Sequence, residues 1–444
     1  MIGTHDMDDI VWKKCIVADI AAPQKNALVG GPFGSNLVSR DYTPFGVPVI
    51  RGQNMGFGRW IGGEFVFVSS QKADVLISNI AKPGDLIFTQ RGTLGQVAIV
   101  PPKPYDTYVI SQSQMKLSSD KLKADVNFLY YLFTSPEQQE YIKQNTIQTG
   151  VPHTNLEHLR NTPLSLPPLS EQQKIARILG SLDDKIELNR QMNETLEAMA
   201  RAIFQSWFVD FEPVQAKAEG RQPAGMDAET AALFPSEMAE VDGREVPKGW
   251  GIGKVSDLGN IICGKTPPTK DPENYGNDML FITIPDMHNQ IFVINTSKKL
   301  SKTGIQTQSN KTLPPMSICV SCIASPGIVI LTTEPSQTNQ QINSVIPFNE
   351  RQAYYCYYAL MDLSNEIKSS GSGGSVIDNL NKADFSDLSI LIPSEQVIEN
   401  YYNQVHSLFS KILLNQKESR TLAHIRDALL PKLMSGELRI NELP

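Results

Sequence analysis

The sequence predicts an α+β protein in which two α/β globules, each with a mixed, mainly antiparallel sheet, are separated by two long helices that pair as an antiparallel coiled coil. Three observations predict this fold. Residues 150–172 are echoed by residues 374–396, a helical stretch with heptad spacing follows each copy, and the regions ahead of the copies follow one plan of strands and turns. The chain is therefore predicted to be a pseudo-twofold internal repeat.

The two copies share letters at a fixed spacing. Asn155-Leu156 matches Asn379-Leu380, and Ser170-Glu171-Gln172 matches Ser394-Glu395-Gln396. The linker between the halves is rich in Ala, Gly, Pro and Glu and has no strand or long helical periodicity, so we expect an irregular connector. The predicted domains are a first globule over 1–167, a first spacer helix over 168–209, the linker over 210–248, a second globule over 249–392, and a second spacer helix with the C-terminal tail over 393–444.

Both helices carry a seven-residue rhythm with one asparagine as the middle rung. The rungs are Ile175, Leu182, Asn189, Leu196 and Ile203 in the first helix and Tyr401, Leu408, Asn415, Leu422 and Leu429 in the second, each 226 positions after its counterpart (401 − 175). Laid antiparallel, the helices bring Ile175 opposite Leu429 and Asn189 opposite Asn415. Because a buried polar pair fixes the register of a coiled coil, the predicted register residues are Leu182, Asn189, Leu196, Leu408, Asn415 and Leu422. In the alternative interpretation, each helix packs only on its own globule and the asparagines face water.

The two globules repeat one order of elements. Each begins with a Gly-rich turn, VGGPFGSN or ICGKTPPT, which is followed by an apolar strand that ends in polar residues. A strand pair comes next, then a polar cluster, Ser111–Gln114 in the first globule and Thr338–Gln341 in the second, and a tyrosine-rich helix closes each globule. A similar plan with different letters indicates two modules that do the same kind of work on different targets.

The composition is that of an ordinary soluble protein. The chain has 444 residues, 41% hydrophobic and 20% charged, and no apolar run approaches the ~18 residues that a membrane span needs. The start MIGTHDMDDIVWKK lacks the apolar core of a signal peptide, so we expect a cytoplasmic protein with no membrane role. Five scattered cysteines indicate a reducing compartment; Cys319 and Cys322 are expected in a half-buried strand, with a zinc site as the alternative. Most of the net charge of −7 lies in the linker, which permits a basic face on the first globule.

Residues 259–266, GNIICGKT, match the phosphate-loop pattern G-x-x-x-x-G-K-[ST]. Such a loop needs a helix directly after its Lys-Thr, with its N-terminus facing the phosphates. Here Pro267, Pro268 and Pro272 follow, and such closely spaced prolines favour an extended or turning segment. We therefore expect a plain loop, and the alternative is an ATPase acting through Lys265. We predict no catalytic residue and no metal site, and we expect the paired carboxylates Asp183-Asp184 on a solvated helix face.

Clustered amide and hydroxyl side chains on the turns indicate recognition of base edges. Gln and Asn bond adenine bidentately and Arg bonds guanine, so these residue types on turns are suited to reading DNA. The segment Gln90-Arg91-Gly92-Thr93 is expected at the tip between two strands, and Trp207 and Phe208 are expected in a core or partner contact. For any single candidate reader the alternative is a solvated loop. The candidates are Arg51, Gln53, Asn54, Gln90, Arg91, Thr93, Ser111, Gln112, Ser113 and Gln114 in the first globule, and Thr283, Asp286, His288, Thr338, Asn339, Gln340 and Gln341 in the second.

Several long segments resemble one known family. LSLPPLSEQQKIARILGSLDDKIELNRQMNETLEAMARAIFQSWFVDFEPVQAKAEG, VPKGW and LLPKLMSGELRI resemble the conserved regions of the specificity subunit of type I restriction-modification systems. KPGDLIFTQRGTLGQVAIV and the GKTP opening resemble segments of that family's target recognition domains. The resemblance covers essentially the whole chain.

The resemblance implies two target recognition domains, each reading one half of a bipartite, asymmetric site in double-stranded DNA, with the helices as the ruler between them. It implies that two modification (methyltransferase) subunits, which bind S-adenosylmethionine and methylate adenine, dock on this scaffold, and that restriction subunits using ATP and magnesium join them. The chain itself then holds no cofactor and positions the DNA, whose target adenine must leave the duplex. One departure is that ILIPSEQVIENYY lacks the Pro-Pro-Leu of LPPLSEQ, so the two docking surfaces are not expected to be equivalent. The rival from another class is a coiled-coil adaptor with no role on DNA.

Overall fold

The computed structural model describes residues 12–56, 58–146, 153–323, 327–370 and 380–440, with only the backbone described over 364–370. The chain divides into two compact units: unit 1 is Met1–Leu188 with Ser419–Pro444, and unit 2 is Asn189–Glu418. Each unit contains one globule and a stretch of both long helices, α6 (Leu169–Phe208) and α12 (Glu395–Ser435). Parts of the sequence repeat, residues 150–152 and 374–379 with Asn379, lie outside the described residues.

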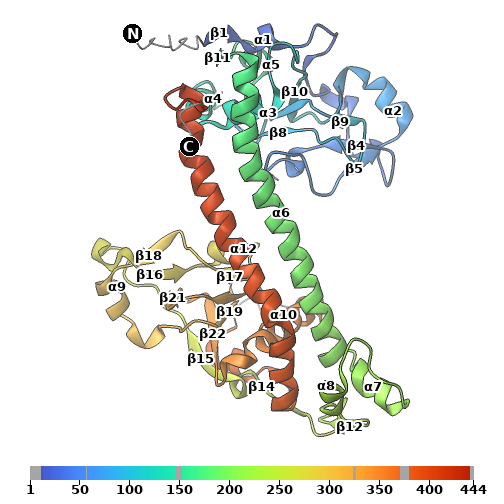
Figure 1. Cartoon of the computed structure of the whole chain (residues 1–444), viewed down its shortest axis with the longest axis vertical. Helices are drawn as coiled ribbons and strands as arrows, with labels where there is room; N and C mark the ends of the chain where they lie inside the picture. The colour runs from blue at the N-terminus through green and yellow to red at the C-terminus, as the bar shows by residue number, and fades with distance from the viewer. Residues whose placement is uncertain (1–11, 57, 147–152, 324–326, 371–379, 441–444) are drawn as a thin grey trace, which may run out of the picture. The chain divides into compact units, whose positions relative to one another are not determined.

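Unit 1 is built from two sheets, a strand pair and short helices (Figure 1). The strands β4 and β9 run parallel and the other strand pairs run antiparallel. One sheet has the order β3 (Tyr42–Thr43), β5 (Val66–Val68), β4 (Val47–Ile50), β9 (Tyr108–Ile110), β6 (Ile80–Ala81); the other has the order β2 (Leu28–Gly30), β10 (Gln114–Leu117), β7 (Leu86–Thr89), β8 (Val97–Ile99); and β1 (Lys13–Ile16) pairs with β11 (Pro163–Leu166). The helices of this globule are α1 (Val17–Ile20), α2 (Ser70–Val75), α3 (Val126–Thr134), α4 (Pro136–Gln144) and α5 (Leu156–Arg160).

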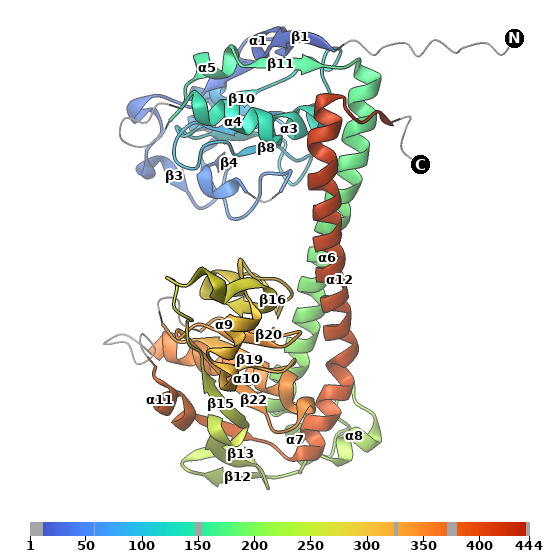
Figure 2. The ribbon, with the colours of Figure 1, turned by 90° about the vertical axis from the view of Figure 1, so that its left-hand side faces the viewer.

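Unit 2 repeats the same plan with its own strands (Figure 2). Its five-stranded sheet has the order β15 (Gly259–Cys263), β22 (Ile342–Pro347), β19 (Ile318–Ser321), β20 (Val329–Thr332), β17 (Phe292–Val293); its three-stranded sheet has the order β18 (Lys298–Leu300), β16 (Tyr275–Ile282), β21 (Ser336–Thr338); and β14 (Gly251–Lys254) pairs with β23 (Ser389–Ile392). The helices are α9 (Lys302–Gln306), α10 (Ala353–Ser370) and α11 (Lys382–Asp387). The parallel pair β16 and β21 corresponds to β4 and β9, so the predicted α+β fold with an internal repeat is confirmed.

Within each unit, stretches of α6 and α12 lie side by side and run in opposite directions (Figures 1 and 2). In unit 1, Ile175 and Leu179 of α6 share a core with Leu430 and Leu433 of α12, and Leu429 packs against that core. In unit 2, Leu196 and Ile203 of α6 and Leu408 of α12 pack against a core that contains Tyr401 and Val405. Apolar seams of this kind stabilise each helix mainly through tertiary packing rather than intrinsic propensity.

Asn189 and Asn415, which the sequence places opposite each other, are both fully buried. The Asn189 amide donates to the main-chain carbonyl of Asn415 at 3.5 Å and to Glu418 Oε2 at 2.8 Å, and Asn415 Nδ2 donates to Asn193 Oδ1 at 2.9 Å. The alternative of solvated asparagines is therefore wrong. The amides do not bond each other; each bonds a group on the facing helix.

The expectation that Asp183-Asp184 lies on a solvated helix face holds for Asp184, whose side chain is 65% exposed, and is wrong for Asp183, whose side chain is 14% exposed. Asp183 accepts hydrogen bonds from Tyr131 Oη at 2.6 Å and from the Arg426 guanidinium at 2.7 Å, and Asp184 pairs with Arg59. Burial, and then the charge of Asp183, raise the pKa of Tyr131 well above its usual value. Gly180 makes room for the cluster, because a Cβ there would lie 2.6 Å from the Arg59 guanidinium. Asp183 therefore ties α3, α6 and α12 together within unit 1.

The linker is folded, which corrects the expectation of an irregular connector. It forms α7 (Glu212–Ala218), α8 (Ala228–Ala232) and the hairpin of β12 (Met238–Val241) with β13 (Arg244–Pro247). The hairpin turn, Asp242-Gly243, has positive φ at both residues, which is the geometry that this dipeptide favours. Val214, Phe234 and Trp250 anchor the segment in the core of unit 2.

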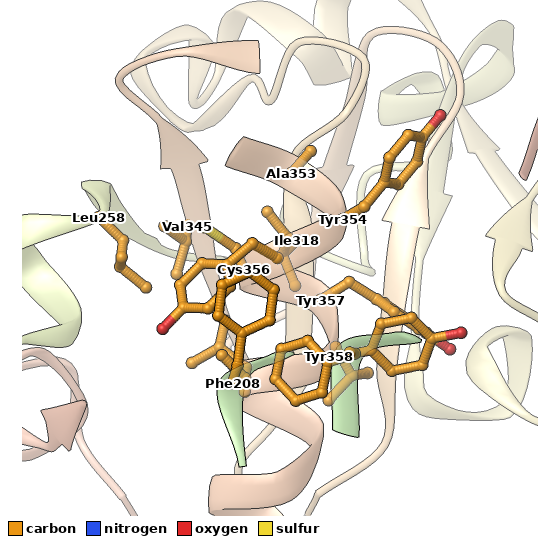
Figure 3. Packing of buried hydrophobic residues seen from close by; sticks show 14 of the residues in the cluster. Phe208, Leu258, Ile318, Val345, Ala353, Tyr354, Cys356, Tyr357 and Tyr358 are labelled. Atoms are coloured by element: carbon orange, nitrogen blue, oxygen red, sulfur yellow. The ribbon is translucent and has the colours of Figure 1, made fainter. Parts of the chain in front are cut away.

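The predictions for Trp207 and Phe208 are confirmed. Trp207 is 6% exposed and Phe208 4% exposed, and both belong to the unit 2 core. Figure 3 shows Phe208 beside the tyrosines of α10. That burial leaves neither ring free to stack on a base. The cysteine pair is fully buried rather than half-buried. Cys319 is part of strand β19, where burial raises the pKa of its thiol to about 12, and Cys322 directly follows that strand.

Candidate nucleic-acid interface

In unit 1, the loops that carry the candidate readers leave the sheets at one edge. The Ser111 N–H donates to the Ile50 carbonyl at 2.9 Å, so the parallel strands β4 and β9 end side by side. The Gln90 N–H donates to the Ser113 carbonyl at 2.7 Å, and the Gly31 N–H donates to the Gln114 carbonyl at 2.8 Å. These main-chain bonds bring together residues 31–37, 51–54, 90–93 and 111–114, which we call the first rim.

Two predicted readers of the first rim have their polar groups engaged inside the protein. Asn54 is 0% exposed; its amide donates to the carbonyls of Gly62 (3.0 Å) and Glu64 (2.9 Å), and its Oδ1 accepts from the Arg51 N–H at 3.0 Å. Gln114 is also 0% exposed; its amide donates to the Ile50 carbonyl and accepts from the Gly52 N–H, both at 3.1 Å. Breaking these hydrogen bonds would leave buried amide groups without partners, which costs free energy. The side chains of Asn54 and Gln114 therefore hold the loops in place.

The other readers of the first rim lie nearer to solvent. Gln53, Arg91 and Thr93 are exposed, whereas Arg51, Gln90, Ser111, Gln112 and Ser113 are half-buried. The Arg51 guanidinium carbon lies 5.8 Å from the centre of the Tyr42 ring, and within the described part of the chain its buried Nε has no hydrogen-bond partner. The exposed Arg91 side chain is therefore accessible to a ligand at this edge, whereas the Gln53 amide already donates to the Glu64 carbonyl at 3.0 Å.

Gln112 and Gly31 hold the Gly-rich loop of the first rim. Gln112 Nε2 donates to the carbonyls of Leu37, at 2.9 Å, and Gly34. Gly31 packs flat on the polar cluster, because a Cβ at this position would lie only 2.0 Å from the Ser111 carbonyl oxygen. Glycine is therefore required here by close approach of two backbones.

Unit 2 has the same main-chain frame at a second rim, residues 264–268, 283–288 and 339–341. The Asn339 N–H donates to the Ile282 carbonyl at 3.2 Å, and the Gly264 N–H donates to the Ile342 carbonyl at 3.1 Å. The frame equates Asn339 with Ser111 and Gln340 with Gln112. This corrects the sequence alignment by one residue: Thr338 is equivalent to Ile110, and it is a strand residue of β21 that is 1% exposed.

The predicted readers of the second rim also divide into holding and exposed residues. Asp286 accepts from the Thr283 N–H (2.9 Å), the Thr283 hydroxyl (2.6 Å) and the Ser297 N–H (2.8 Å), so it caps the turn as Asn54 does in the first rim. Asn339, 8% exposed, donates to Gln341 Oε1 at 2.9 Å. His288 and Gln340 are exposed, and Gln341 is half-buried.

The GNIICGKT segment forms part of the second rim. Its first five residues are strand β15, and residues 264–271, all of them described, form no helix after Lys265. Gly264 packs against the polar cluster, since a Cβ would lie 2.1 Å from the Asn339 carbonyl oxygen, as at Gly31. A phosphate loop needs the missing helix, so the interpretation as an ATPase is wrong. Sequence reasoning overlooked exposed Lys265 as a rim residue, although the matching Gly-rich turns signal its position.

Comparison with known proteins identifies the family. A family model described as "Type I restriction modification DNA specificity domain" matches residues 68–198 and 247–423. The chain belongs to the type I restriction-modification specificity subunit family. It is 40% identical over 400 residues to the HindI specificity subunit of Haemophilus influenzae, covering 80% of this chain and 87% of that protein. It is 27% identical to the MjaIX specificity subunit of Methanocaldococcus jannaschii, covering 81% and 79% of the two chains.

The fold of this specificity subunit resembles a solved relative. The crystal structure of the S subunit from M. genitalium aligns with a TM-score of 0.59 at 17% identity, covering 97% of this chain and 98% of that one. Each match to the family model runs from a globule into a long helix, in line with the internal repeat. Specificity subunits are non-catalytic members of their systems, and an adaptor without recognition domains for DNA does not fit this family. Among the described residues, no helix is both long and apolar enough to cross a membrane.

Proposed function

We propose that this specificity subunit reads a bipartite, asymmetric site in double-stranded DNA, one half with each rim. The observation that carries the proposal is the repeated main-chain frame, which mounts different side chains at equivalent positions in the two units. Base edges in the major groove are distinguished by donor and acceptor patterns, so two rims with different side chains read two different half-sites. The recognition domains are proposed to be residues 1–167 and 249–392.

The proposed readers are the side chains that the rims leave accessible. In the first rim they are Arg51, Gln53, Gln90, Arg91, Thr93, Ser111, Gln112 and Ser113, and in the second Lys265, Thr283, His288, Gln340 and Gln341. Asn54, Gln114, Asp286 and Asn339 are proposed to support them from behind, because their polar groups are bonded within the loops. Thr338 is left out because it is buried in β21.

We propose that the helix pair fixes the gap between the half-sites. Buried Asn189 and Asn415 each donate from the side-chain amide nitrogen to a group on the facing helix, which disfavours a slipped register because a slip would remove these acceptors. Leu182, Leu196, Leu408 and Leu422 flank these asparagines as the apolar rungs. A fixed register keeps the gap constant from one DNA molecule to the next.

Two modification subunits are proposed to dock on the helices. Among the described residues, each unit exposes one large apolar residue of each helix: Leu188 (51% exposed) and Ile425 (43%) in unit 1, and Leu414 (61%) and Met199 (50%) in unit 2. Leu414 is 226 positions after Leu188 (414 − 188), and Ile425 is 226 after Met199 (425 − 199), so the repeat relates the two pairs. Duplicated apolar positions suit two copies of one partner. The modification subunits would bind S-adenosylmethionine, and restriction subunits with ATP and magnesium would complete the assembly.

The docking proposal is tested by native mass spectrometry of the assembly. Leu188→Asp or Leu414→Asp should each lower the number of bound modification subunits from two to one, because a carboxylate in an apolar contact is costly. Leu122→Asp is the matched control, since Leu122 is 87% exposed on the globule of unit 1. Loss of both subunits from either single variant, or of none, would contradict two separate surfaces.

The reading proposal is tested by sequencing methylated adenines in cells that carry this chain with its modification subunit. The expected result is one motif with two specified halves and a constant unspecified gap. A contiguous motif, or methylation that depends on no sequence, would refute the function proposed here.

A further inference from the structure

The Gly-rich loop of the first rim carries an aromatic ring in solvent. Phe33 is 87% exposed, although its neighbour Pro32 and nearby Leu37 are buried. Isolated exposed apolar side chains are common on protein surfaces and by themselves mean little. What distinguishes Phe33 is the loop that holds it and the polar groups that surround that loop.

The loop is held in place on both sides of Phe33. The Gly31 N–H bonds the Gln114 carbonyl, and the Asn36 N–H bonds the carbonyl of Phe33 itself at 3.1 Å. Gln112 Nε2 donates to the carbonyls of Gly34 and Leu37. A ring on a loop tied in this way loses little conformational freedom when it meets a ligand, so its contact free energy is retained in binding.

The polar groups near Phe33 indicate that its ligand is DNA. Gln112, whose amide holds the loop, is one of the proposed readers, and exposed Arg91 lies on the same rim. Many proteins that bind the minor groove insert an apolar side chain between two base pairs, which partly unstacks that base step. Every base has a π face, so such a contact needs no particular sequence.

We propose that Phe33 is a wedge that inserts at a base step of the half-site read by the first rim. The inference rests on the proposed function. In unit 2 the equivalent residue is Thr266, whose hydroxyl donates to Gln340 Oε1 at 2.6 Å, so the device belongs to the first half-site only. The unstacked step would also lower the cost for the partner subunit of moving the target adenine out of the duplex.

The test uses the full chain assembled with its modification subunits on a duplex that carries its methylation motif. 2-Aminopurine replaces one base at a time in the first half-site, at positions other than the methylated adenine. We expect fluorescence to rise at one step with the wild-type chain and to stay low with Phe33→Ala. Phe33→Ala should weaken binding roughly 5- to 150-fold, in the range of one base–aromatic stack, while Phe33→Tyr keeps both signals.

Phe45→Ala is the matched control. Phe45 is 80% exposed on the same globule but precedes β4, whereas the rim residue Arg51 follows that strand. The wedge is overturned if Phe33→Ala behaves like Phe45→Ala, if no position brightens with the wild-type chain, or if Phe33→Ala releases a modification subunit and leaves DNA affinity unchanged. In each of these outcomes the wild-type chain still binds its DNA site specifically. If the proposed function itself is wrong, the wild-type chain shows no sequence-specific binding.

Discussion

In the first rim Gln112 holds the Gly-rich loop through the carbonyls of Gly34 and Leu37, whereas in the second the equivalent Gln340 holds it through the hydroxyl of Thr266. Gly31 and Gly264 meet the polar cluster equally closely in the two units. The exposed groups differ: the first rim presents Phe33 and Arg91, and the second presents Lys265 and His288. The main-chain frame therefore determines the positions of the proposed base-reading residues. The side chains at those positions determine which bases are recognised.

The globules also differ in how each is fastened to the helices of its own unit. In unit 1 a charged cluster does this, with Asp183 between Tyr131 and Arg426. In unit 2 two residues of α10 do this: Tyr358 Oη donates to the Glu197 carbonyl at 3.1 Å, and Asp362 pairs with Arg201 of α6 at 2.6 Å. The shared plan is thus compatible with different chemistry at the fastening.

The largest effect is expected from a substitution that disrupts the main-chain frame of one rim and leaves that of the other rim intact. Gly31→Ala places a methyl group against the Ser111 carbonyl and displaces the loop, so binding through the first half-site should fall by about 100-fold or more, since several base contacts of about 1–3 kcal/mol each depend on it. Competition with duplexes mutated in one half-site measures the loss. Gly264→Ala should do the same for the second half-site.

Gly52→Ala is the control for the glycine variants. Gly52 lies on the first rim, and a Cβ there meets nothing within 4 Å. The affinity of the Gly52→Ala variant for DNA with the first half-site should match that of the wild type. An equal loss from Gly52→Ala and Gly31→Ala would show that the close approach of the two backbones is not the cause.

A single reader should have a smaller and one-sided effect. Arg91→Ala removes an exposed guanidinium from the first rim, so affinity for the first half-site should fall roughly 5- to 150-fold, or specificity at one base pair should relax. Lys103→Ala removes an exposed charge ahead of β9, whereas Ser111 of the rim follows that strand, and it serves as the control. Equal losses at both half-sites would count against Arg91 as a reader.

The smallest expected effect on DNA binding comes from the residues that join the globule of unit 1 to its helices. Asp183→Asn removes the charge that Arg426 and Tyr131 bond, so the free energy of unfolding should fall by about 1.5–3 kcal/mol. Asp184→Asn should cost less, because the Asp184 side chain is 65% exposed, whereas that of Asp183 is 14% exposed. Denaturant unfolding measures both, and hydrogen exchange should place the change in unit 1. Equal effects of the two substitutions would contradict the role given to Asp183.

The helix pair could be predicted from the sequence because its pattern is local and repeated. Heptad spacing located both helices, and the matched asparagines placed Asn189 opposite Asn415. The cluster at Asp183 could not be predicted in this way, because Tyr131 and Arg426 lie far from it in the chain and only the packed structure brings them together. The folded linker was partly readable: Asp242-Gly243 is a hairpin signal, but the burial of Phe234 and Trp250 depends on tertiary contacts.

The candidate base-reading residues were also predictable only in part. Residue types identified the loops, and the structure brings those loops to one edge in each unit. Residue types could not show that Asn54 and Gln114 bond their own loops while Arg91 stays in solvent, because that choice depends on neighbouring carbonyls. The shift of one residue between Thr338 and Asn339 arose because both segments are polar, and only strand pairing fixes their alignment.

The central claim is that one chain carries two recognition sites and that each site reads its own half-site. Sequencing of methylated adenines in cells that carry wild type, Arg91→Ala or Gln340→Ala tests it most directly. We predict that Arg91→Ala relaxes one half of the motif and Gln340→Ala the other, with the gap unchanged in both. A change in both halves from either variant, or a change in the gap, would contradict it.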